Sequence, residues 1–222
     1  MYLALGMALA SLAGSSVDIQ TPPIFNPGAP GSASRVVSAS EAVELSRTTF
    51  TGDDVGFMQH MIVHHAQAVE MVELLQTRGS HPTVQRLGRR IALSQEAEIA
   101  LMRGWLTDRN QSLEMPGMGA SHAGMDHSAH AGHAMPASDV PLMAGMLSPA
   151  QMRGLAAVHG PAFDLLFLEG MIQHHQGAID MVTALAAQPG AAEDPMLSEF
   201  TNSVVADQSA EILRMQTLLS DL

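Results

Sequence analysis

The chain has 222 residues, a formal net charge of −12 and no cysteine. The missing cysteines exclude disulfides, thiolate metal sites and cysteine nucleophiles, and the acidic balance disfavours nucleic acid and anionic membrane surfaces as partners. Hydrophobic residues make up 46% and aromatic residues only 4%, with 17 methionines, a composition that favours packed helices over a sheet.

The N-terminal segment predicts export. Residues 1–16 are apolar and end in small side chains, which resembles the core of a secretory signal peptide, although a basic n-region is missing. The segment is too short to span a membrane, so we expect a periplasmic or extracellular protein whose mature chain has no membrane span. The alternative is a frayed apolar terminus of a cytosolic protein. Residues 17–40 are rich in Pro, Gly and Ser and are predicted to form a disordered linker.

The rest of the chain, residues 41–222, is predicted to be one domain made of two halves, 41–110 and 149–222. Each half should hold a short helix followed by two long ones, because Pro and Gly mark helix ends at regular places. The long helices are predicted at about 53–78, 82–109, 161–188 and 195–222. Residues 111–148 have low complexity and are predicted to be a long disordered linker between the halves.

An internal repeat is the strongest signal in the chain. Phe57–Val72 recurs as Phe167–Val182, 110 residues further on, and eight of the sixteen positions are identical, including a His-His pair in each copy. Helical periodicity places both members of each pair on or beside a wide apolar face. Glu98 and Glu211 stand at matching places on the apolar stripes of the second and fourth long helices. Two repeated helix hairpins predict an all-α fold, a four-helix bundle.

The histidine pairs predict a metal site in the bundle core. One buried histidine is more often a hydrogen-bonded structural residue, but four in matched pairs with matched methionines favour metal, and imidazole with thioether is a ligand set for copper. For the glutamates three roles stay open: ligand, acceptor that orients a ligating histidine, or structural partner. The predicted ligands of the core are His64, His65, His174, His175, Met61, Met71, Met171, Met181, Glu98 and Glu211.

The linker carries a second set of candidate ligands. Short His-rich tracts are typical of metal binding, and the mixture with methionine narrows the metal to copper, with Cu(I) favoured and Cu(II) also accepted. The alternative is a flexible spacer of biased composition. The predicted linker ligands are His122, Met125, His127, His130, His133 and Met135.

These motifs resemble the bacterial family called domain of unknown function 305. The resemblance rests on the His-His repeat, the upstream Asp54 and Asp164, a downstream Gln-x-x-Glu-Ile and the stretch PLMAGMLSPAQ. It implies a ferritin-like four-helix bundle, usually exported, with some members tied to copper binding and resistance. Gly170 and Gln176 depart from the family pattern, which more often has Met and Glu there. The family motif falls on Met61, His64, His65, Met171, His174 and His175.

We therefore predict an exported protein that sequesters or buffers copper and is not an enzyme. Its partners are copper ions and other periplasmic copper-handling proteins. One alternative is a ferritin-like di-iron oxidase, but that chemistry uses Glu-x-x-His motifs, and Met61 and Met171 occupy the place of the glutamate. A second alternative is a metal-free helical interaction module whose His–Glu pairs fix the helix register. The sequence does not define the oligomeric state.

Overall fold

The computed structural model describes residues 22–26, 33–45, 49–115 and 139–222. The chain forms two compact units, Met1–Arg47 and Thr48–Leu222. We call the second one the helical unit. The predicted signal peptide, residues 1–16, lies outside the described residues. None of the described helices is both long and apolar enough to cross a membrane.

The first unit contains a small antiparallel sheet and a short helix. Strand β1 (Ile24–Asn26) pairs with β2 (Arg35–Val37), with Phe25 opposite Val36. Helix α1 (Ala39–Leu45) follows directly, and the Ser38 hydroxyl accepts the Glu41 backbone N–H at 3.1 Å at its start. This regular structure differs from the prediction of a disordered linker over residues 17–40. The β-branched and aromatic residues of both strands favour the pairing.

The helical unit consists of α2 (Gly52–Arg78), α3 (Pro82–Asp108), α4 (Pro149–Ala157), α5 (Pro161–Ala186) and α6 (Pro195–Asp221). All except α2 begin with proline, whose missing N–H and fixed φ suit the first helical position. A capping box starts α2, in which Thr51 and Asp54 each accept the other's backbone N–H. The same device starts α4, through Ser148 and Gln151.

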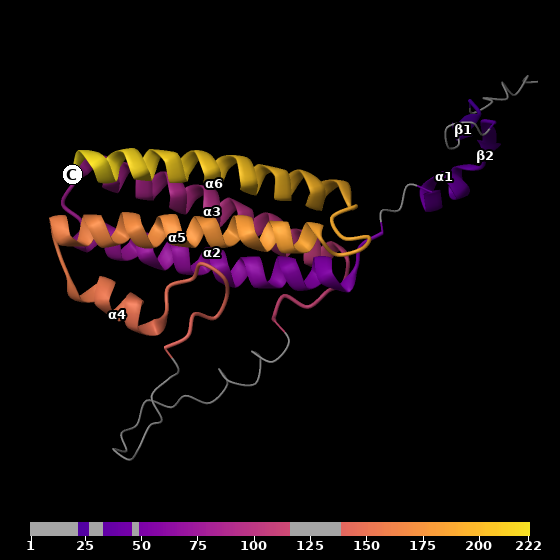
Figure 1. Ribbon diagram of the computed structural model, residues 1–222. Coiled ribbons are helices and arrows are strands. Elements are labelled where there is room, and N and C mark those ends of the chain that lie inside the picture. The colour runs from indigo at the N-terminus through magenta and orange to yellow at the C-terminus, as the bar shows by residue number, and fades with distance from the viewer. Residues whose placement is uncertain (1–21, 27–32, 46–48, 116–138) are drawn as a thin grey trace, which may run out of the picture. The chain divides into compact units, whose positions relative to one another are not determined.

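The four long helices lie side by side as two hairpins (Figure 1). Helix α2 packs on α3, α5 packs on α6, and the hairpins meet where α2 packs on α5. Buried aspartates join each hairpin to the other. Asp54 on α2 accepts the Ala192 backbone N–H from the α5–α6 connection, and Asp164 on α5 accepts those of Ser80 and His81 from the α2–α3 connection. The described chain is mostly helical, as predicted.

The core of the helical unit has two hydrophobic clusters, one toward each end of the long helices. On α2, for example, Phe57, Met58, Met61 and Ile62 belong to one cluster and Ala68, Met71, Val72 and Leu75 to the other. The same division recurs on α3, α5 and α6. On each long helix, the residues between the two clusters include buried polar side chains.

The end of the predicted linker is a packed part of the core and not a disordered segment. Met146, Leu147 and Ser148 are buried, and the Gln67 amide on α2 bonds both the backbone N–H and the carbonyl of Leu147, at 2.7 and 3.0 Å. Residues 139–148 therefore lie against the helices as a fixed cover. We call them the covering loop. The prediction of a disordered linker over 111–148 was wrong for these ten residues, because the apolar side chains of Met146 and Leu147 are buried against the helices.

Candidate metal centre

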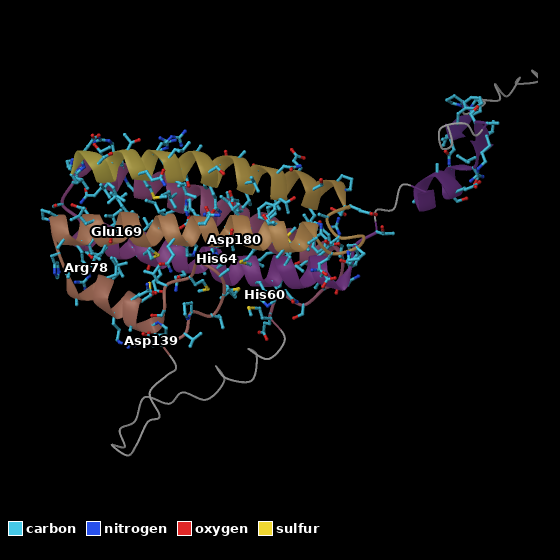
Figure 2. All side chains as sticks on the ribbon, viewed as in Figure 1. His60, His64, Arg78, Asp139, Glu169 and Asp180 are labelled. Carbon is cyan, nitrogen blue, oxygen red and sulfur yellow. The ribbon has the colours of Figure 1, made fainter. Side chains whose placement is uncertain are left out.

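A layer of polar side chains crosses the middle of the helical unit, between its two hydrophobic clusters. Figure 2 labels His64 near the middle of α2. Every long helix contributes one polar pair to this layer. Six of its residues are buried, and the two glutamates are half-buried. The polar layer consists of His64 and His65 (α2), Gln95 and Glu98 (α3), His174 and His175 (α5), and Gln208 and Glu211 (α6).

The outer histidine of each pair binds a glutamate of its own hairpin. His65 Nε2 lies 2.6 Å from Glu98 Oε2, and His175 Nε2 lies 2.7 Å from Glu211 Oε2. Both imidazoles are fully buried, while the glutamate side chains are 16% and 14% exposed. The prediction that Glu98 and Glu211 contact the histidine pairs is confirmed. Each carboxylate is therefore partly exposed to solvent and also binds a buried imidazole.

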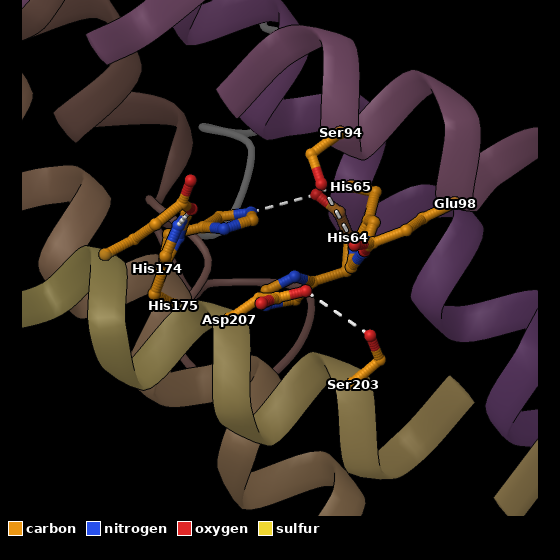
Figure 3. A network of polar contacts seen from close by, with 9 residues as sticks. His64, His65, Ser94, Glu98, His174, His175, Ser203 and Asp207 are labelled. Carbon is orange, nitrogen blue, oxygen red and sulfur yellow. Dashed lines mark hydrogen bonds and ion pairs between the residues drawn. The ribbon is translucent and has the colours of Figure 1, made fainter. Parts of the chain in front are cut away.

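The inner histidines bind backbone carbonyls and lie face to face. His174 Nε2 donates to the His64 carbonyl at 2.9 Å, and His64 Nε2 donates to the Ala144 carbonyl of the covering loop at 3.0 Å. The two rings are 3.9 Å apart between centroids, inclined by 40°. Figure 3 shows the two pairs facing each other across the contact between α2 and α5. The repeat symmetry is broken here, because the covering loop replaces the α5 backbone as the partner of His64.

The second nitrogen of every imidazole in the layer is buried and has no hydrogen-bond partner among the residues that the structure describes. The Nδ1 atoms of His64, His65, His174 and His175 have no hydrogen bond, and the same holds for Gln95 Oε1 and both amide atoms of Gln208. A carbonyl oxygen only accepts, so Nε2 of the inner histidines carries the hydrogen. An unpartnered buried polar atom costs about 1–3 kcal/mol. The layer therefore has four imidazole nitrogens whose binding capacity is unused.

Burial keeps the inner imidazoles neutral. It lowers the pKa of His64 to about 3, and the neighbouring His65 adds to the shift. It also lowers the pKa of His174 well below the usual value, with His64 the next cause. A neutral ring whose Nε2 carries the hydrogen leaves the Nδ1 lone pair free. The inner histidines therefore present two lone pairs to the interior at neutral pH.

The predicted methionine ligands border the layer unequally. Met61, Met71 and Met171 are fully buried in the two hydrophobic clusters, while Met181 is half-buried. Within the described residues, no three His, Cys, Asp or Glu side chains are grouped to hold a metal ion. A site in this layer therefore has to combine imidazole with thioether. The linker ligands His122, Met125, His127, His130, His133 and Met135 lie outside the described residues.

The covering loop approaches α5 very closely, which the sequence motifs did not predict. Gly145 has φ +73°, and a Cβ atom there would lie 2.5 Å from Gly177 Cα. A Cβ on Gly177 would lie 2.2 Å from the Ala144 carbonyl oxygen, the atom that accepts His64 Nε2. Gln173 also donates to the Gly145 and Met146 carbonyls, at 3.3 Å each. The sequence does carry one sign of this close approach, because Gly177 stands in the second copy where the first copy has Gln67.

The chain belongs to the family described as domain of unknown function (DUF305), whose model matches residues 54–219. A DUF305 protein from Streptomyces coelicolor that is thought to be secreted is similar, with 26% identity and a TM-score of 0.61 over 77% of this chain and 95% of that one. A DUF305 fragment from Deinococcus radiodurans has 28% identity and a TM-score of 0.61, over 78% and 99%.

Proteins of this fold have also been solved with bound metal. CopM in its Cu(I)-bound form has 25% identity to this chain and a TM-score of 0.54, covering 78% of this chain and 98% of that one. The Cu(II)-bound form of CopM has 28% identity and a TM-score of 0.54, over 76% and 96%. No curated protein matches the chain. The family is thus established, and CopM is a similar protein solved with copper.

Proposed function

We propose that this protein is an exported copper-binding protein that sequesters or buffers copper and has no catalytic role. The observation that carries the proposal is the set of four buried imidazoles whose Nδ1 atoms have no partner. Metal-ligating histidines usually donate their other ring N–H to a carboxylate or a backbone carbonyl, which fixes the tautomer and the ring orientation. Glu98, Glu211 and the carbonyls of His64 and Ala144 provide those acceptors.

The donor set favours copper over other metals. Nδ1 atoms of the polar layer and thioethers of Met61 and Met171 are soft or borderline ligands, which suit Cu(I), and imidazole also accepts Cu(II). In this proposal Glu98 and Glu211 hold the outer histidines and do not themselves bind the ion. CopM, solved with both copper states, supports the assignment. Export is supported by the similarity to the Streptomyces coelicolor protein.

Two alternatives predict different donor sets. We infer a ferritin-like four-helix bundle, and in that fold a di-iron oxidase uses several bridging carboxylates, whereas the polar layer has two glutamates, each already bound to a histidine. A metal-free interaction module would use the layer only for helix register. Such a module gives no reason for the unpartnered Nδ1 atoms, each of which lowers its stability.

The test separates the two nitrogens of the outer histidines. Glutamine places an amide N–H near the position of Nε2 and has no counterpart of Nδ1, so His65→Gln with His175→Gln keeps the contacts to Glu98 and Glu211 and removes two ligands. In anaerobic Cu(I) titrations against a competing chelator, the double variant should lose the tightest class of site. His159→Gln, at an exposed histidine, should bind as wild type. An unchanged isotherm in a folded double variant would contradict the proposal.

A further inference from the structure

The repeat creates two equivalent surfaces where α2 meets α5, and the structure covers one of them. In the second half, the place that a Cβ atom on Gly170 would take is 3.2 Å from Leu147 Cδ2 of the covering loop and 3.2 Å from Met71 Cε. Met71 is fully buried there. Leu155 of α4 belongs to the same hydrophobic cluster as Met71. The covering loop and α4 therefore cover Met71 on this surface and leave a smaller pocket, of about 280 Å³, that Leu147, Leu155 and Gly170 line.

The matching surface of the first half is open and carries different chemistry. His60 stands at the position of Gly170 and Met181 at the position of Met71, by the same offset of 110 residues. Both line an open pocket of about 330 Å³ between α2 and α5, together with Asp53, Phe57 and Leu185. His60 and Met181 are half-buried and Asp53 is exposed, and Figure 2 labels His60 on α2. An imidazole, a thioether and a carboxylate thus line one accessible pocket.

We infer that this pocket is a second, outer binding site for a monovalent soft cation, Cu(I) or its analogue Ag(I). The inference rests on the proposed function for the choice of metal. Imidazole and thioether are ligands that Cu(I) accepts, and the Asp53 carboxylate offsets the positive charge. Because His60 and Met181 come from different hairpins, an ion bound by both joins α2 to α5. Unlike the polar layer, the pocket is reached by an ion without any opening of the helical unit.

The position of the pocket suits an entry site. The Gln59 amide donates to the Ser112 carbonyl at 2.7 Å, so the chain that leaves α3 lies against α2 next to His60. The Met/His-rich segment of the sequence begins at Met115, three residues after Ser112. A site near Ser112 is only a few residues of chain from the start of that segment, and such tethering raises the effective concentration of its ligands.

The test follows single methionines in the full-length protein during titration with silver nitrate. Protein labelled with ¹³C at the methionine methyl groups gives a separate signal for Met181, assigned with Met181→Leu. We expect this signal to shift on addition of Ag(I), and His60→Ala to weaken Ag(I) binding at this site by about tenfold or more. The matched control is His159→Ala, which removes an exposed imidazole outside the pocket and should leave the Met181 shift unchanged.

The outcomes separate this site from the polar layer. A shift at Met181 that His60→Ala removes supports the outer site. If the signals of Met61 and Met171 do not shift in the same titration, the polar layer does not bind the metal, and only the proposal for that layer is overturned. Shifts at Met61 and Met171 with no shift at Met181 overturn the outer site and leave the layer standing. A Met181 shift of equal size and affinity in His60→Ala also overturns it, because His60 is then no ligand.

Discussion

Glu98 and Glu211 occupy equivalent places in the repeat but have different polar neighbours on their own helices. Besides His65, Glu98 accepts the Ser94 hydroxyl at 3.3 Å. At the corresponding place before Glu211 stands Asp207, which cannot donate and instead accepts the Ser203 hydroxyl at 3.3 Å. Two carboxylates one helical turn apart repel each other. Glu98 therefore has a hydrogen-bond donor on its own helix that Glu211 lacks at the corresponding place.

Substitutions at Glu98 should separate hydrogen bonding from charge. Glu98→Gln keeps an oxygen that accepts His65 Nε2–H and should cost less than about 1 kcal/mol, whereas Glu98→Ala leaves a buried donor unpaired and should cost about 1–3 kcal/mol. Urea denaturation of the metal-free protein measures both. Glu96→Ala, at an exposed glutamate of the same helix, should stay within about 0.5 kcal/mol of wild type. Equal losses in the two Glu98 variants would show that the contact is not a hydrogen bond of consequence.

The buried inner histidines should make stability depend on pH. The pKa of His174 is well below 6.5 in the folded protein, while the unfolded ring takes up a proton near pH 6.5. Protons therefore favour the unfolded chain. The contribution of this ring to stability is complete above about pH 6.5 and is lost as the pH falls toward the folded pKa, by about 2 kcal/mol between pH 6.5 and 5.

A comparison of two proteins at two pH values isolates this effect. The free energy of unfolding of metal-free wild type should fall between pH 7.5 and 5.0, and the fall should be smaller by about 2 kcal/mol in His174→Gln, which does not titrate. Carboxylates contribute equally to both proteins and cancel. The same fall in both proteins would mean that His174 is protonated in the folded state, contrary to the effect of its burial.

The covering loop depends on two glycines, Gly145 and Gly177, that lie in close contact. Gly145→Ala and Gly177→Ala each drive a Cβ atom into backbone, which cannot move as a flexible side chain does. Each should cost more than about 2 kcal/mol and disturb the His64–Ala144 contact. Gly104→Ala in α3 meets open space and should instead stabilise by roughly 0.5–1 kcal/mol through helix propensity. Thermal or urea unfolding measures all three variants, and an unchanged Gly177→Ala protein would show that the loop is loosely held.

The long helices were predictable because the signals for them are local. Proline at Pro82, Pro161 and Pro195 marks their starts, and the apolar stripes fix the buried faces. The covering loop was not predictable by the same means. Its contacts join Leu147 to Gln67 and Ala144 to His64, and the partners are 80 residues apart in each case. A periodic sequence pattern does not predict contacts between residues so far apart. The low complexity of the preceding segment also made the whole stretch resemble a spacer.

The duplication of the chain predicts that the polar layer exists, but it does not predict every contact within the layer. The two histidine pairs and two glutamates were expected in one interior, and the contacts between the glutamates and the histidine pairs are as predicted. The loss of symmetry at His64, and the open pocket at His60, depend on which of two equivalent surfaces is covered. The two short helices also begin alike, since Ser38 and Ser148, 110 residues apart, stand at the starts of α1 and α4 and accept backbone N–H groups.

The Met/His-rich segment should contribute copper sites without contributing to the fold. Its six predicted ligands lie outside the described residues, and the contacts between the hairpins are made by α2 and α5. Replacing Met115–Pro136 by a Gly/Ser chain of equal length keeps the loop-closure entropy and leaves the covering loop intact. The metal-free variant should therefore retain helical content and thermal stability, as circular dichroism measures.

The same replacement should remove the weaker class of copper sites and spare the tighter one. A flexible chain must be ordered around an ion, and that costs conformational entropy, whereas the imidazoles of the polar layer are already fixed by Glu98, Glu211 and two carbonyls. Anaerobic Cu(I) titration against a competing chelator resolves the two classes. If the variant unfolds, the segment is structural and the division into halves is wrong. If the complete isotherm survives, the segment is a spacer of biased composition, and the polar layer and the pocket at His60 account for all the bound copper.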